Sequence, residues 1–140
     1  MSWIVLKYGG SSLSAEGINN IYNRINKIDD SSVIIVLSAI NKVTNLIAES
    51  FDNESNYNKI YNIHHDLLIE LNCNKNDIFE ELLLDLKKLI DNKQKIKAIS
   101  YGEILSTSLV SLYFSEKKKL DIELLNVGDF LKSDRENDNN

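Results

Sequence analysis

The chain has 140 residues, of which 43% are hydrophobic and 26% charged, and its formal net charge is -5 at pH 7. This composition is typical of one soluble globular domain or part of a larger one, and the negative charge argues against a nucleic-acid partner, because binding phosphates requires clustered Lys and Arg. One cysteine excludes an intrachain disulfide, no Cys/His cluster suggests a metal site, and no membrane span or signal peptide is recognisable, so the expected compartment is the cytoplasm.

The amino-terminal part of the chain predicts a strand–helix–strand unit. Residues 2–8 (SWIVLKY) are typical of a short buried strand that ends at two glycines. Residues 15–28 follow helical spacing, with Ser14 as the expected N-cap. Residues 33–38 predict a second strand that is apolar on both faces, as in a parallel sheet covered by helices on both sides.

The rest of the chain is predicted to be mainly helical. Apolar spacing indicates helices over 43–51, 57–71, 78–90 and 96–114, the last with its pattern interrupted near residues 100–103. Residues 120–127 predict a third strand, and the polar residues 135–140 predict a disordered tail. We therefore expect a three-layer α/β/α fold with a mostly parallel sheet, in which a helical segment separates the second strand from the third.

The first candidate site is the glycine loop after the first strand. Gly9 and Gly10 allow backbone amides to approach a ligand, and Ser11 adds a hydroxyl before a helix begins. The loop is either a phosphate cradle or a tight turn, and it matches neither GxxxxGK[ST] nor GxGxxG. Lys7 lies in a strand that is otherwise typical of a core. It either faces water at an edge or reaches past the carboxyl end of the strand towards a phosphate.

Two further segments carry polar groups in apolar surroundings. Ser38 ends the second strand, and Thr44 lies near the start of the next helix, where its hydroxyl either caps backbone amides or binds an anion. Gly102 and Glu103 interrupt an apolar helix. A glycine there costs about 1 kcal/mol relative to alanine, so it indicates a close approach, while Glu103 either faces solvent or binds a cationic group.

Four segments together resemble the amino-terminal part of an aspartate kinase, in the amino-acid kinase superfamily. They are VLKYGGSSL at 5–13, IVLSAINKVTNLI at 35–47, SYGEILSTSL at 100–109 and LDIELLNVGDFLKSD at 120–134, in the order of the family. The resemblance assigns residues 1–134 to this part of the kinase domain. It implies transfer of the γ-phosphoryl group of ATP, with Mg²⁺, to the side-chain carboxylate of L-aspartate. The product is 4-phospho-L-aspartate, the first intermediate towards lysine, threonine and methionine.

The resemblance also implies roles for the residues on the phosphate side of the site. Lys7 would neutralise the phosphoryl group during its transfer. Gly9, Gly10 and Ser11 would bind the ATP phosphates through their backbone amides. In such a reaction the protein contributes mainly positioning and charge neutralisation.

On the substrate side, the resemblance implies that Ser38 and Ala39 line the reacting centre. Thr44 would contact the bound aspartate, and Glu103 would hold its α-ammonium group. These four residues would form part of the substrate half of the site, and the arginine that binds the α-carboxylate of the substrate lies in the part of the family's domain that follows this region.

The resemblance covers only part of a complete aspartate kinase, which continues with nucleotide-binding segments and regulatory domains. The sequence leaves open a fragment of a longer protein, a truncated gene product, or a reduced chain that works as a homo-oligomer or with a chain that supplies the missing half. It also leaves open two other functions. One is a non-catalytic aspartate-binding or regulatory subunit, and the other is a related kinase for a different acidic metabolite.

Overall fold

A computed structural model describes residues 2–125, in which two strands form a parallel sheet. β1 (Ser2–Tyr8) pairs with β2 (Ser31–Leu37) so that the two strands end side by side, with Tyr8 opposite Leu37. The connection between them is the short 3₁₀ turn η1 (Gly10–Ser12) followed by α1 (Ala15–Asn26). This is the predicted strand–helix–strand unit.

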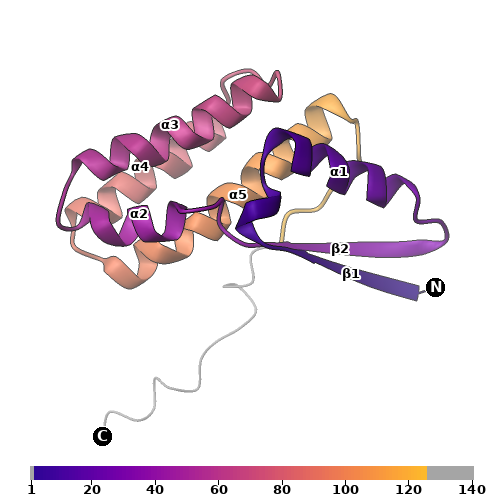
Figure 1. The fold of residues 1–140 in the computed structure, drawn as a ribbon, viewed down its shortest axis with the longest axis horizontal. Coiled ribbons are helices and arrows are strands. Elements are labelled where there is room, and N and C mark those ends of the chain that lie inside the picture. Colours follow the sequence, from indigo (N-terminus) through magenta and orange to yellow (C-terminus); the bar gives the residue numbers. More distant parts are fainter. Residues whose placement is uncertain (1, 126–140) are drawn as a thin grey trace, which may run out of the picture.

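Four more helices follow the second strand. They are α2 (Val43–Ser50), α3 (Ser55–Glu70), α4 (Asp77–Asp91) and α5 (Lys95–Lys117). α2 packs against α3 and α5, and α4 packs against α5. Figure 1 shows α2, α3 and α4 gathered beside the end of the sheet, while the long α5 runs from this group back towards α1. Within residues 2–125, none of the helices combines the length and apolar character needed to cross a membrane.

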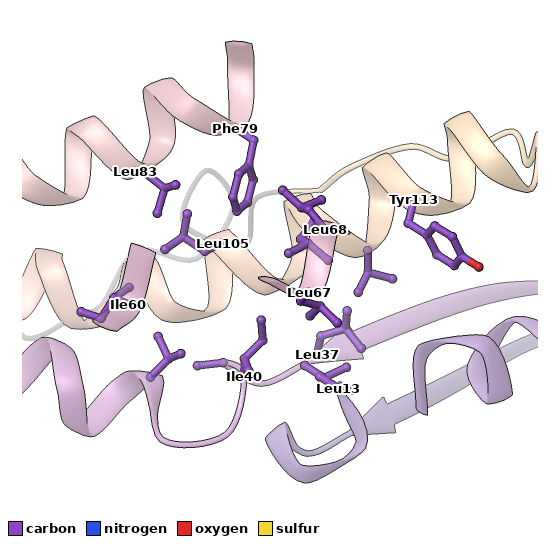
Figure 2. Packing of buried hydrophobic residues seen from close by; sticks show 14 of the residues in the cluster. Leu13, Leu37, Ile40, Ile60, Leu67, Leu68, Phe79, Leu83, Leu105 and Tyr113 are labelled. Carbon is purple, nitrogen blue, oxygen red and sulfur yellow. The ribbon is translucent and has the colours of Figure 1, made fainter. Parts of the chain in front are cut away.

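The hydrophobic core runs from the helical group to the ends of the two strands. Leu83, Leu105 and Phe79 are almost fully buried between the helices. Leu37 and Leu13 continue the same buried cluster beneath the strands and the glycine loop, and Figure 2 shows this continuity. Because the loops at the strand ends rest on this core, their backbones are held in fixed places.

Helices cover one face of the sheet and leave the other open. On the covered face α1 and α5 meet, with the rings of Tyr22 and Phe114 6.0 Å apart. The other face carries apolar side chains that remain exposed in the described residues. We name it the open sheet face, and its members are Trp3, Val5, Ile34 and Val36. The α/β class with a parallel sheet is confirmed, and residues 2–125 contribute two of the three predicted layers.

The helix predicted over 96–114 is α5, which continues through the interrupted pattern at residues 100–103, because Gly102 is buried against another segment and a helix tolerates glycine at a modest cost. The predicted third strand needs correction. Residues 120–125 do not form a strand, because a strand requires a hydrogen-bonded neighbour and the described part of the sheet ends with β1 and β2. The last two residues of the predicted strand and the predicted tail 135–140 lie outside the described residues.

Candidate functional site

The parallel register brings the loops after β1 and β2 into direct contact. The Ser38 backbone N–H donates to the Tyr8 carbonyl oxygen at 3.1 Å, and the Asn41 N–H donates to the Gly10 carbonyl oxygen at 3.3 Å. A Cβ atom on Gly10 would collide with the Ala39 carbonyl oxygen. Glycine at position 10 is therefore required by the contact between the two loops.

α5 joins the same place through its third and fourth turns. The Ser106 hydroxyl donates to the Ser38 carbonyl oxygen at 2.7 Å. A Cβ atom on Gly102 would lie 2.9 Å from the Ala39 Cβ and 3.6 Å from the Thr44 Oγ1. The three segments that the sequence singled out therefore converge on one site, although about 60 residues of chain separate the second from the third.

The glycine loop itself is a single tight turn. The Ser12 N–H donates to the Gly9 carbonyl oxygen at 3.0 Å, and the Leu13 N–H donates to the Gly10 carbonyl oxygen at 3.2 Å. Leu13 is 2% exposed and fixes the loop to the core. A Cβ atom on Gly9 would meet no atom within 4 Å, so the exposed side of the loop has room for a ligand.

An open pocket of about 290 Å³ lies where these loops meet. Four predicted site residues line it, and so do four residues that sequence reasoning missed. The predicted ones are Gly10, Ser11, Ala39 and Thr44; the others are Ile40, Asn41, Lys42 and Asn45. These four residues could have been predicted to line the site, because they lie between Ala39 and Thr44 or directly after Thr44 in the sequence. A larger hollow of about 490 Å³ lies between α3 and α4 and contains none of the predicted residues.

Four predicted site residues are not among those that line the pocket: Lys7, Gly9, Ser38 and Glu103. Lys7 is exposed and pairs with Val36 on the open sheet face. The inference that Lys7 lies in a buried strand is therefore wrong, because no described helix covers that face. Ser38 is half-buried and contributes its carbonyl oxygen to the contact with α5, while Glu103 is exposed on the turn of α5 that contains Gly102.

The charge distribution around the pocket favours an anionic ligand. Among the described residues that line it, Lys42 is the only one with a charged side chain, and none is a carboxylate. A protein-bound Mg²⁺ does not fit this set, because Mg²⁺ requires oxygen ligands that usually include a carboxylate. Within residues 2–125 no group of three or more His, Cys, Asp or Glu side chains is placed to hold a metal ion.

Comparison with known proteins identifies a family and solved structures of similar fold. A family model described as the amino acid kinase family matches residues 2–140. E. coli aspartokinase III in complex with lysine and aspartate (T-state) is 20% identical with a TM-score of 0.69, and the same enzyme in complex with aspartate and ADP (R-state) is 24% identical with a TM-score of 0.70. No curated protein matches the chain.

These likenesses confirm the predicted fold, that of the amino-acid kinases. Both alignments cover 84% of this chain, but only 29% and 30% of the two aspartokinase chains. The sequence therefore spans less than a third of the proteins that it resembles. At 20% and 24% identity the likeness concerns the fold alone.

Proposed function

This chain belongs to the amino acid kinase family, and we propose that residues 1–134 are the amino-terminal part of an aspartate kinase domain. The proposed reaction transfers the γ-phosphoryl group of ATP to the side-chain carboxylate of L-aspartate. The fold shared with aspartokinase III supports this assignment, as do the four sequence segments that resemble aspartate kinases. Membership of the family indicates a kinase of this class but does not identify its substrate, so the choice of L-aspartate is part of the proposal.

The observation that carries the proposal is the meeting of three distant segments, two of which line one pocket while the third packs against them. The glycine loop, the loop after β2 and the third turn of α5 meet through Gly10, Ala39 and Gly102. Such a meeting point at the carboxyl ends of parallel strands is where α/β folds bind ligands. It places the hydroxyl groups of Ser11 and Thr44 beside the glycine loop, and the exposed Glu103 follows Gly102 on α5.

In the proposed mechanism the chain positions two anionic reactants and reduces their repulsion. An oxygen of the aspartate side chain forms a bond to the γ-phosphorus, the bond from that phosphorus to its bridging oxygen breaks, and ADP leaves with the electron pair. The amides of Gly9, Gly10 and Ser11 would hold phosphate oxygens, and Lys7 would add positive charge from the strand end. Mg²⁺ would arrive bound to the ATP phosphates.

The substrate would bind on the side of the loop after β2. Ser38 and Ala39 would line the reacting centre, and Thr44 would donate a hydrogen bond to the bound aspartate. Glu103 would pair with the α-ammonium group, which requires its exposed side chain to turn towards the pocket. Pairing of this carboxylate with a cation would select an amino acid over a simple dicarboxylate.

We also propose where the reaction takes place and with which partners. The product would be the first intermediate towards lysine, threonine and methionine, formed in the cytoplasm, where the free thiol of Cys73 stays reduced. The working protein would be a homo-oligomer or would associate with a chain that supplies the rest of the kinase domain. The exposed apolar residues of the open sheet face support this association.

Calorimetric titration of L-aspartate into the purified protein tests the substrate assignment. We expect aspartate to bind to the wild type. Glu103→Gln should weaken aspartate binding about tenfold or more, because the variant loses a charge-assisted hydrogen bond. Glu116→Gln is the matched control, since Glu116 is another exposed glutamate on α5. Equal binding to the wild type and Glu103→Gln would contradict the role of Glu103, and binding of glutamate but not aspartate would contradict the substrate.

A second candidate is a non-catalytic aspartate-binding or regulatory chain, and the exposed position of Lys7, outside the residues that line the pocket, favours it. Trapping of the acyl phosphate by hydroxylamine separates the two. Aspartyl hydroxamate formed with ATP supports a kinase, whereas aspartate binding without hydroxamate supports the second candidate. Stabilisation of the protein against thermal unfolding by N-acetylglutamate, but not by aspartate, would indicate a related kinase for another acidic metabolite.

A further inference from the structure

Lys42 is a pocket residue to which the sequence assigned no role. It lies in the loop after β2, directly before α2, and it is exposed. Its side chain is the only charged one among the described residues that line the pocket, and none of the ion pairs found within residues 2–125 includes it. The pocket therefore has a single cation, surrounded by backbone, hydroxyl and amide groups.

The backbone around Lys42 is fixed on both sides. The Asn41 N–H donates to the Gly10 carbonyl oxygen at 3.3 Å, which ties the loop to the glycine loop. On the other side Val43 is completely buried, and the Leu46 N–H donates to the Lys42 carbonyl oxygen at 3.0 Å. The Lys42 Cα atom is thus held beside Gly10 and Ser11, and only the side chain is free to move.

The conformation of Lys42 is one that lysine rarely adopts. Its φ of 71° lies in the left-handed region, which glycine, asparagine and aspartate enter more readily. Lys93 and Lys119 also have positive φ, but each follows the end of a helix, where this conformation is common. Lys42 instead precedes a helix, and its side chain makes no capping hydrogen bond there. Nothing local explains a lysine at this position.

We propose that Lys42 binds a phosphate oxygen of the phosphoryl donor, as the cation opposite the glycine loop. The identity of the donor as ATP rests on the proposed function, whereas the phosphate chemistry rests on the pocket. An ammonium group on a flexible stem is a common phosphate ligand, and here it would complement the amides of Gly10 and the hydroxyl of Ser11. Lys42 would then supply from inside the pocket the positive charge that Lys7 supplies from outside it.

Calorimetric titration of inorganic tripolyphosphate and of ATP tests this assignment in the purified protein. Lys42→Asn removes the charge and suits the left-handed conformation, so its thermal stability should equal or exceed that of the wild type. We expect it to bind both ligands about tenfold more weakly. Lys93→Asn is the matched control, because it makes the same change at another exposed left-handed lysine, away from the pocket. It should bind both as the wild type does.

Titration of L-aspartate in parallel separates this proposal from the proposed function. If Lys42→Asn binds tripolyphosphate like the wild type, or if the wild type binds neither phosphate ligand, the role of Lys42 is overturned. If Lys42→Asn weakens the binding of aspartate and leaves the binding of the phosphate ligands unchanged, Lys42 recognises a carboxylate and the phosphate assignment is wrong. A wild type that binds the phosphate ligands but not aspartate, together with weaker binding of the phosphate ligands by Lys42→Asn, would support the role of Lys42. The same result would contradict the assignment of aspartate as the substrate.

Discussion

His64 in α3 is a buried imidazole with only one of its ring nitrogens satisfied. It is 0% exposed, its Nδ1 lies 2.7 Å from the Ile60 carbonyl oxygen, and its Nε2 has no hydrogen-bond partner in the described residues. Burial lowers the pKa of His64 to about 4, the hydrogen bond to Ile60 opposes this, and the neighbouring His65 adds to it. A proton on this ring would therefore strongly destabilise the fold.

The folded protein should lose stability as the pH falls from about 6.5 to about 4, because only the unfolded state binds a proton at His64 in this range. The difference between the ordinary pKa of 6.5 and the value of about 4 in the folded protein corresponds to about 3 kcal/mol of unfolding free energy. This contribution to stability is fully present above pH 6.5. Urea unfolding at several pH values measures the loss. His64→Leu should flatten the curve in this range and His65→Gln should not; a slope that persists in His64→Leu would contradict the role of His64.

Lys7 illustrates what residue types alone can and cannot predict. The sequence could place the glycine loop and the polar residues after β2 at strand ends, because Gly and Ser commonly follow strands in turns. It could not show that Lys7 is exposed, because Trp3 and Val5 on the same strand face are apolar and suggested a covered sheet. They are 64% and 61% exposed in the described residues. Lys42 was overlooked because backbone dihedrals are invisible in a sequence.

At the scale of elements, the packing of α5 on the loop after β2 depends on Gly102. An added Cβ would lie 2.9 Å from the Ala39 Cβ, so Gly102→Ala must displace the loop. Overpacking of this kind costs about 1–3 kcal/mol, against about 1 kcal/mol gained from the helix propensity of alanine. We expect a net loss of about 1 kcal/mol in chemical unfolding, together with weaker aspartate binding because Thr44 moves.

Two variants make this prediction specific. Gly9→Ala adds a Cβ where no atom lies within 4 Å and where the backbone is ordinary, so it should leave stability unchanged or raise it slightly. Ala39→Gly combined with Gly102→Ala removes the facing methyl group and should recover most of the loss. Full stability of Gly102→Ala alone would show that the contact between α5 and the loop is loose.

The helices were predictable where one face is apolar and the other polar. α1 and α4 begin at the capping residues Ser14 and Asn76, whose side chains accept hydrogen bonds from the N–H groups of Gly17 and Phe79. α5 was harder because it packs on several sides, so its apolar residues follow no single stripe. The segment 120–125 is apolar enough for a strand, but a strand requires a partner, and sequence pattern does not report whether one is present.

At the scale of the whole molecule, the open sheet face is the main unsatisfied surface of the described residues. Its four members are apolar side chains on two paired strands, and the backbone edges of a two-stranded sheet are also unpaired. Exposed apolar patches of this kind mark protein interfaces or aggregation sites. The pattern of these strands predicted the parallel sheet, but it could not distinguish a face covered by this chain from one that another surface must cover.

We therefore expect the isolated 140-residue chain to self-associate. Light scattering after size exclusion should give a mass above that of one chain, increasing with concentration. Replacing Val5 and Ile34 together by threonine keeps the strand propensity but makes the face polar, so the mass should fall towards the monomer. Ile69→Thr is the control, because Ile69 is as exposed (69%) but lies alone on α3, and it should leave the mass unchanged. A stable monomer at all concentrations would mean that the open sheet face tolerates water, and association would then have to be sought elsewhere on the molecule.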